Sequence, residues 1–125
     1  KFLDRPKIFG LDRIDLTERV YVVEGPIDSL FLNNSLAVAG SDFVDLPPCE
    51  ATIIMDNEPR SKEIVNKMEQ LIEKNYELVI WPDSITQKDI NDTVLAGQQD
   101  IQLIIDNNTF SGLEARMKLS AWKRI

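Results

Sequence analysis

The stretch Arg19-Val-Tyr-Val-Val-Glu-Gly-Pro26 decides the fold of this chain. Its β-branched and aromatic residues predict a strand buried on both faces. Gly25 and Pro26 form a tight turn, and Pro26 can occupy the first position of a helix. The stretch therefore predicts a strand that passes through an acidic residue, Glu24, into a short helix of about two turns.

Two further apolar runs have the same character, Ala51-Thr-Ile-Ile-Met55 and Glu77-Leu-Val-Ile-Trp81. A fourth strand is predicted over residues 36–39, and residues 7–10 form a possible short strand and turn. Helix-like segments separate most of these runs, so the chain is predicted to alternate between strands and helices. Such alternation favours a parallel sheet with right-handed crossovers.

The helical segments are predicted from periodicity and capping. Ser61 is the expected N-cap of the clearest helix, and Glu63 and Lys67 pair on its solvent side. Its apolar face carries Ile64, Val65, Met68, Leu71 and Ile72. In the short helix that begins at Pro26, the shared face is expected to carry Ile27, Leu30 and Phe31. Further helices are predicted over residues 90–96, 98–106 and 110–123, and residues 41–49 are predicted to be a loop.

Composition narrows the possible functions. The chain has 125 residues, 43% of them hydrophobic, which is enough for one compact core. A net charge of -7 argues against a freestanding nucleic-acid binder. One cysteine and no histidine exclude an internal disulfide, Ser-His and Cys-His catalysis, and the usual zinc sites. No apolar run approaches the roughly 20 residues that span a bilayer, and a cytoplasmic location is expected.

Acidic residues follow three of the predicted strands. Glu24 follows the first, Asp56 and Glu58 follow the second, and the group Asp83, Asp89 and Asp92 follows the third. Because parallel strands end at the same edge of a sheet, these carboxylates are expected to converge where α/β proteins bind ligands. Hard divalent cations prefer oxygen ligands. The pattern therefore suggests a metal site, although each acid alone could equally cap or begin a helix.

The same segments resemble the three acidic motifs of the Toprim domain, which occurs in DnaG-type primases, topoisomerases and several nucleases. The similarity is greatest to the C-terminal, polymerising part of T-even-type bacteriophage DNA primases and covers nearly the whole chain. It rests on the segments Val22-Val-Glu-Gly-Pro-Ile-Asp-Ser-Leu30, Asp56-Asn-Glu-Pro-Arg60, Lys88-Asp-Ile-Asn-Asp92 and Gly112-Leu-Glu-Ala-Arg-Met-Lys-Leu-Ser120.

This resemblance implies an α/β Toprim (Rossmann-like) fold, with a mainly parallel four-stranded sheet flanked by helices and a helical C-terminal tail. Residues 1–18 would end the N-terminal subdomain of the primase core, residues 19–97 would form the Toprim domain, and residues 98–125 a C-terminal helical segment. By this resemblance, the chain would not include the zinc-binding domain of such primases. The chain is therefore interpreted as a fragment, which can be inactive by itself.

The activity implied is Mg²⁺-dependent synthesis of short RNA primers for lagging-strand replication. Two Mg²⁺ or Mn²⁺ ions, and no zinc, are expected. Asp56 and Glu58 are the expected metal ligands, with Asp89 or Asp92 as an additional one, and Glu24 would bind metal or act as the base. In the usual second motif the second acid is Asp, and in the usual third motif one residue separates the acids. Here Glu58 stands in the position of that second Asp, and two residues separate the acids Asp89 and Asp92 of the third motif.

The partners implied are single-stranded DNA, ribonucleoside triphosphates and a replicative hexameric helicase, in the host cytoplasm if the protein is phage-encoded. Candidates for phosphate binding are Lys1, Lys7, Arg60 and Lys88. Two alternative functions use the same fold, a metal-dependent Toprim nuclease and a non-catalytic assembly or DNA-binding module. A plain α/β binding domain predicts no metal site at all.

Overall fold

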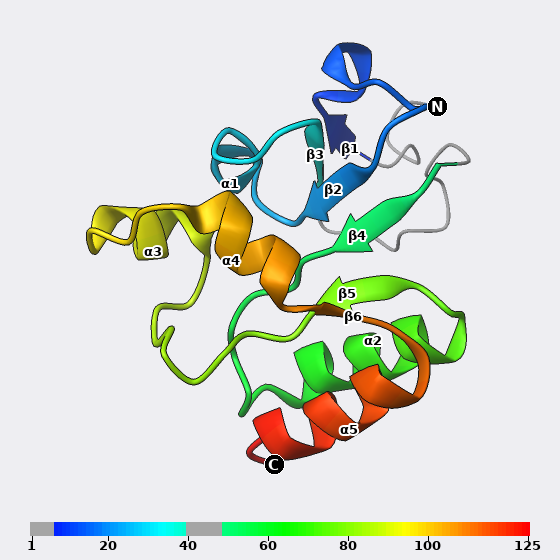
Figure 1. Ribbon diagram of the computed structural model, residues 1–125, viewed down its shortest axis with the longest axis vertical. Helices are drawn as coiled ribbons and strands as arrows, with labels where there is room; N and C mark the ends of the chain where they lie inside the picture. The colour runs from blue at the N-terminus through cyan, green and yellow to red at the C-terminus, as the bar shows by residue number, and fades with distance from the viewer. Residues whose placement is uncertain (1–6, 40–48) are drawn as a thin grey trace.

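Six strands form one sheet in the computed structural model of the chain (Figure 1). The structure describes residues 7–39 and 49–125. The strands are β1 (Lys7–Phe9), β2 (Val20–Val23), β3 (Ser35–Ala39), β4 (Ala51–Ile53), β5 (Glu77–Val79) and β6 (Thr109–Phe110). The helices are the 3-10 helix η2 (Leu11–Arg13), α1 (Pro26–Ser29), α2 (Lys62–Glu73), α3 (Ile90–Leu95), α4 (Ile101–Asn107) and α5 (Gly112–Trp122).

The strand order is β1-β3-β2-β4-β5-β6, and the four inner strands are parallel. The prediction of a mainly parallel sheet is therefore confirmed, and the four predicted strands are its parallel centre in a sheet of six. β1 pairs antiparallel with β3 at one edge, and β6 pairs antiparallel with β5 at the other. The chain has a mixed α/β architecture of the Rossmann-like type, consistent with the Toprim fold.

The sheet changes its direction of winding between β2 and β4. From β2 the chain crosses to β3 on one side, then returns to build β4 and β5 on the other. Right-handed crossovers in opposite directions place their helices on opposite faces, so α1 and α2 are separated by the sheet. In Figure 1, α2 and α5 form one group and α1, α3 and α4 another. The carboxyl ends of β2 and β4 therefore meet at the crevice where such sheets bind ligands.

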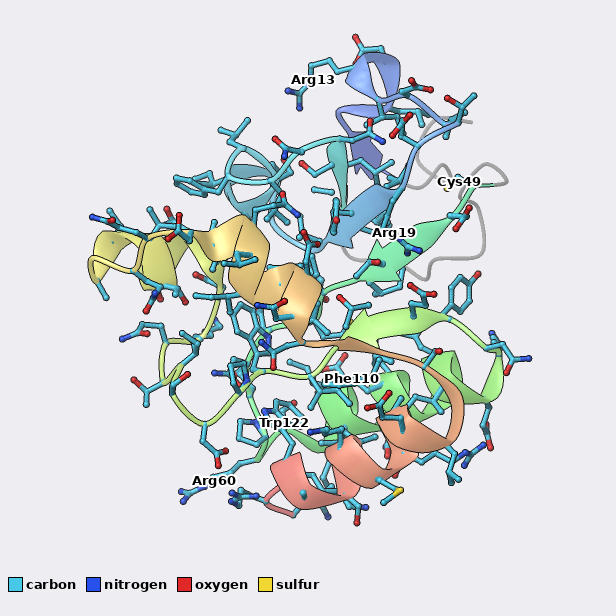
Figure 2. All side chains as sticks on the ribbon, in the orientation of Figure 1. Arg13, Arg19, Cys49, Arg60, Phe110 and Trp122 are labelled. Carbon is cyan, nitrogen blue, oxygen red and sulfur yellow. The ribbon has the colours of Figure 1, made fainter. Side chains whose placement is uncertain are left out.

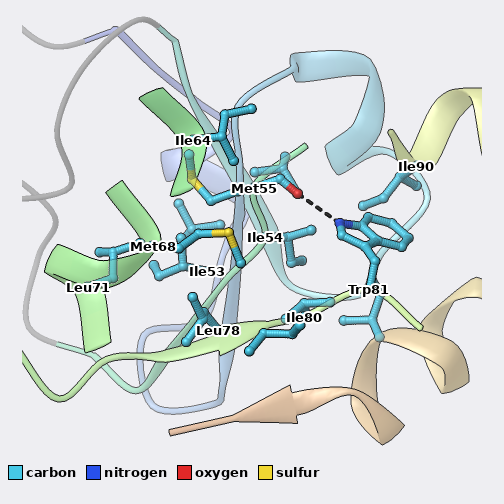
Figure 3. Packing of buried hydrophobic residues seen from close by; sticks show 14 of the residues in the cluster. Ile53, Ile54, Met55, Ile64, Met68, Leu71, Leu78, Ile80, Trp81 and Ile90 are labelled. Carbon is cyan, nitrogen blue, oxygen red and sulfur yellow. Dashed lines mark hydrogen bonds between the residues drawn. The ribbon is translucent and has the colours of Figure 1, made fainter. Parts of the chain in front are cut away.

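The core lies between the central strands and the helices. Val22, Ile53 and Leu78, one from each of three neighbouring strands, are completely buried. Figure 3 shows Trp81 packed beside Ile90, with its indole nitrogen Nε1 donating a hydrogen bond of 2.9 Å to the backbone oxygen of Met55. Because no buried side-chain polar atom in residues 7–39 and 49–125 lacks a partner, this core carries little desolvation penalty.

The helix predicted after Ser61 is confirmed as α2. Its predicted apolar face is buried, and the Ser61 hydroxyl accepts a hydrogen bond from the Ile64 amide at 3.3 Å. The Glu63 carboxylate and the Lys67 ammonium lie 3.8 Å apart on the solvent side. Local periodicity and capping thus fix this helix, which carries the main chain from the end of β4 to the start of β5.

Two C-terminal predictions need correction. Residues 98–106 were expected to be helical, but α4 begins only at Ile101, because Asp100 adopts a left-handed backbone with φ 58°. Residues 110–123 were also expected to be helical, whereas Phe110 belongs to β6 and α5 begins at Gly112. Thr109 and Phe110 pair with Val79 and Leu78, so pairing with the sheet edge outweighs continuation of the helix.

The other sequence predictions fall partly outside the described residues. The short strand expected near residue 7 is confirmed as β1, and the strand over residues 36–39 as β3. The loop predicted for residues 41–49 lies almost wholly outside the described ranges, as does Lys1. The proposed domain boundaries stay predictions. No helix in the described ranges has the length and apolar character needed to cross a membrane.

Candidate metal centre

Three carboxylates converge at the carboxyl edge of the parallel strands. Each of Asp28, Asp56 and Asp89 offers an oxygen within 4.8 Å of an oxygen of the other two. Asp56 follows β4, Asp28 lies in α1 after β2, and Asp89 precedes α3 after β5. The acidic trio, as these three are called below, therefore collects one acid from each of three adjacent β-α connections. An all-oxygen, anionic donor set of this kind can bind a hard divalent cation.

Asp28 is the member that the sequence reasoning missed. The short helix was expected to bury Ile27 and Leu30, but these are 59% and 61% exposed, while Asp28 is only 7% exposed. The Asp28 carboxylate accepts a hydrogen bond of 2.8 Å from the Asn91 amide at the start of α3. Periodicity misleads here because a helix of four residues is too short to define a face. One feature of the sequence could have identified Asp28. It lies four residues after Glu24, in the first helical turn, which folds back over the edge of the sheet.

Gly25 permits the close approach of Asp28. A Cβ atom at Gly25 would lie 3.0 Å from the Asp28 carboxylate oxygen Oδ2, closer than ordinary van der Waals contact. The glycine of the opening stretch thus has a role beyond making a turn. Its missing side chain leaves room for a carboxylate of the acidic trio.

Asp89 has two roles at once. It is the N-cap of α3, where its side-chain oxygen accepts a hydrogen bond of 2.8 Å from the Asp92 amide. It also offers a carboxylate oxygen to the acidic trio. Asp92 lies in the first turn of α3 and is exposed. Within the described residues, the structure therefore brings Asp89 into the trio and leaves Asp92 outside it.

Burial and mutual repulsion raise the pKa of two carboxylates of the acidic trio. The pKa of Asp56 is raised from 3.8 to about 7, first by burial and then by the negative charges of Glu24, Asp89 and Asp28. The Lys88 ammonium acts in the opposite direction and lowers the pKa of Asp56. Burial is also the main cause that raises the pKa of Asp28. Carboxylates this crowded are stabilised by a bound cation or by protons.

Glu24 lies beside the acidic trio without joining it. Its charge raises the pKa of both Asp28 and Asp56, which places it in the same electrostatic neighbourhood. The β2–β4 register aligns Val22 with Ile53, so the two strands end within about a residue of each other. The expected convergence of the first and second acidic segments is thus observed.

Glu58 and Arg60 lie in the turn between β4 and α2. The Glu58 amide donates to the backbone oxygen of Asp56 at 2.9 Å, and Glu58 and Arg60 line a shallow pocket with Pro59 and Ser61. Figure 2 shows Arg60 at the outer edge of the molecule, near the end of α5. Neither residue joins the trio in the described part of the chain, and their proposed roles stay predictions. Lys7 belongs to β1, and its phosphate-binding role also stays a prediction.

The fold and this site together describe a Rossmann-like α/β domain, consistent with a Toprim fold, that has a carboxylate cluster at its switch point. No family model matches the chain. The chain is 35% identical over 126 residues to the DNA primase of Enterobacteria phage T4, an alignment that covers 95% of this chain and 36% of that protein. The chain is thus a primase-related domain, and it spans about a third of the length of this relative.

Proposed function

We propose that the chain is the RNA-polymerising part of a phage-type DNA primase, which makes short RNA primers on single-stranded DNA for lagging-strand replication. The observation that carries the proposal is the acidic trio at the sheet's switch point, in a chain related over 95% of its length to a DNA primase. The division into a core remnant, a Toprim domain and a C-terminal helical segment belongs to the same proposal, as does a replicative helicase as partner.

Asp28, Asp56 and Asp89 would hold the divalent cation, Mg²⁺ or Mn²⁺, and Glu24 would bind a second ion or act as the base. The chemistry that such ions supply when bound is acidification of the attacking 3′-hydroxyl and stabilisation of charge on the departing pyrophosphate. The protein's part is to hold the carboxylates in fixed positions. Burial of Asp28 and capping by Asp89 both serve this purpose, since they restrict the two side chains before any ligand arrives.

Lys88 is the best-placed candidate for contact with a triphosphate. It is exposed, and its charge acts on Asp56, so it lies at the rim of the acidic trio. A lysine there would attract the anionic nucleotide toward a site that is otherwise strongly negative. Lys1, Lys7 and Arg60 are retained as further candidates on the primase resemblance alone.

A primer-synthesis assay tests the proposal. The protein is incubated with single-stranded DNA, four ribonucleoside triphosphates and Mg²⁺, and the products are separated by size. We expect short RNA from the wild type. In Asp56→Asn, the amount of RNA made should fall by more than about 100-fold, because loss of a group that only supports a metal ligand already lowers metal affinity or activity about 10- to 100-fold. Asp83→Asn is the matched control, since Asp83 is exposed and lies outside the acidic trio.

The alternatives predict other products. Cleavage of the DNA without ribonucleotide incorporation would identify a Toprim nuclease. Such cleavage would refute the proposed polymerising role of this chain. Absence of both products from a folded protein is expected of an assembly or DNA-binding module and also of a fragment that is inactive by itself. Titration with Mg²⁺ distinguishes these two, because an assembly or DNA-binding module needs no cation at the acidic trio.

A further inference from the structure

Asn57 directly follows Asp56, and its side chain uses both amide donors and its carbonyl oxygen in hydrogen bonds. Its Nδ2 donates to the backbone oxygens of Ile85 and Gln87, both at 3.0 Å. Its Oδ1 accepts a hydrogen bond of 3.1 Å from the indole nitrogen Nε1 of Trp122. A flipped amide would set its oxygen against two carbonyl oxygens and its NH₂ against an N–H donor. The surroundings therefore fix a single orientation of this side chain.

The loop held by Asn57 leads directly to the third member of the acidic trio. The Asn57 backbone amide also donates to the oxygen of Lys88 at 2.6 Å. Three hydrogen bonds from one residue thus attach residues 85–88 to the end of β4. Because Asp89 is the next residue, its distance from Asp56 depends on this attachment.

Indole groups donate hydrogen bonds to the residues that directly precede and follow Asp56 in the sequence. Trp81 donates to the backbone oxygen of Met55, and Trp122 donates to the side chain of Asn57. Trp122 comes from α5, 65 positions further along the chain, and is 7% exposed. Figure 2 shows it pointing inward from the helix. The C-terminal helix is therefore hydrogen-bonded to the residue that directly follows Asp56 of the acidic trio.

We propose that Asn57 is a positioning residue that sets the separation of Asp89 from Asp56, with Trp122 fixing the orientation of its amide. This inference rests on the proposed function, because it takes the acidic trio as a divalent-cation site. Mg²⁺ demands near-ideal octahedral geometry at short distances, whereas Ca²⁺ accepts variable geometry. Release of the loop should therefore weaken Mg²⁺ binding more than Ca²⁺ binding. A purely structural role for Asn57 predicts no such difference.

Calorimetric titration with each cation tests the inference. In Asn57→Ala we expect Mg²⁺ affinity to fall about 10- to 100-fold, as for other groups behind a metal ligand, and Ca²⁺ affinity to fall less. Trp122→Phe keeps an aromatic ring but removes the N–H donor, so a smaller fall is expected. Asn66→Ala, on the exposed side of α2, is the matched control and should bind both cations within about twofold of the wild type.

Circular dichroism first establishes which variants are folded. The inference is overturned if folded Asn57→Ala binds Mg²⁺ within twofold of the wild type, or if both affinities fall equally. If Asn57→Ala does not fold, Trp122→Phe decides by the same criterion. A wild type that binds neither cation would instead refute the metal site of the proposed function, which is a distinct result from an Asn57 variant that binds normally.

Discussion

At the residue scale, the site is defined by which carboxylates meet. Asp28 and Asp89 are both anchored by backbone amides at the start of α3, through Asn91 and Asp92 respectively. Asp56 follows β4, the strand that lies between β2 and β5 in the sheet. The start of one short helix therefore organises two of the three carboxylates, and loss of a trio member should affect cation binding far more than loss of an acid nearby.

Separate substitutions of Asp28 and Asp92 distinguish an acid of the trio from a nearby acid outside it. Asp28→Asn keeps the acceptor for the Asn91 amide but removes a charge from the trio, so we expect Mn²⁺ affinity to fall at least about 10-fold. Asp92→Asn removes an exposed charge outside the trio and should change affinity by less than about threefold. Calorimetric titration measures both. A larger loss in Asp92→Asn than in Asp28→Asn would show that Asp92 is the ligand.

The raised pKa of Asp56 predicts how stability depends on pH without metal. Between about pH 4 and pH 7 the folded protein keeps a proton on Asp56 that the unfolded chain, with a pKa of 3.8, has released. The folded state then binds more protons, so the free energy of unfolding falls as pH rises through this range. The part due to Asp56 should be about 1–2 kcal/mol, since water reaches this carboxylate and screens its neighbours.

Urea denaturation in the presence of a chelator, at pH 4.5 and pH 8, measures this effect. In Asp56→Asn, the free energy of unfolding should change little between pH 4.5 and pH 8. This variant should therefore be more stable than the wild type at pH 8. Asp83→Asn, which alters an exposed acid outside the trio, should keep the wild-type dependence. Equal pH dependence in the wild type and Asp56→Asn would contradict the electrostatic account of the trio.

At the scale of elements, the two serines at helix starts differ in what they do. The Ser61 hydroxyl accepts the Ile64 amide at the start of α2. Ser111 occupies the equivalent position of α5 without any side-chain capping bond. The same residue type at the same formal position thus makes a capping bond in one helix only, and the pair offers an internal comparison.

Replacement of each serine by alanine tests the capping bond. Ser61→Ala should lower the free energy of unfolding by about 1 kcal/mol, the usual value of an N-cap hydrogen bond. Ser111→Ala should change it by less than about 0.5 kcal/mol. Urea denaturation monitored by circular dichroism gives both values. Equal losses would mean that the Ser61 bond contributes nothing beyond the preference for serine at a helix start.

At the scale of the whole molecule, one sheet joins segments from both ends of the chain. β1 and β6 complete its two edges, and α5 packs on α2 and is hydrogen-bonded through Trp122 to Asn57, the residue that directly follows Asp56. Leu78 lies in β5, between β4 and the edge strand β6, and is completely buried. Its side chain should therefore contribute to the stability of the fold as a unit.

Leu78→Ala should lower the free energy of unfolding by about 2–5 kcal/mol, because it leaves a cavity in the core. Leu113→Ala is the control, since Leu113 is 73% exposed on α5 and its loss should cost less than about 0.5 kcal/mol. Chemical denaturation of both variants checks the prediction. A loss below about 1 kcal/mol in Leu78→Ala would mean that β5 is not part of the cooperative core.

Local sequence patterns predict the parallel strands, α2 with its Ser61 cap, and the gathering of acids at one edge of the sheet. These features depend on local periodicity and on the rule that parallel strands end together, so neighbouring residues carry the information. Asp56 could be predicted for this reason, because it follows a buried run, whereas Asp89 could be predicted only as one of two alternatives with Asp92.

The remaining features depend on contacts between distant parts of the chain. Asp28 enters the trio through a contact with Asn91, β6 forms because it meets β5, and Asn57 bonds with Trp122. Each depends on atoms that are distant in sequence, where separations of a few ångströms decide the outcome. Periodicity and motif spacing contain no such distances. The sequence therefore predicted a carboxylate site at the edge of the sheet. The packing of the chain determined which acids form the acidic trio and which hydrogen bonds support it.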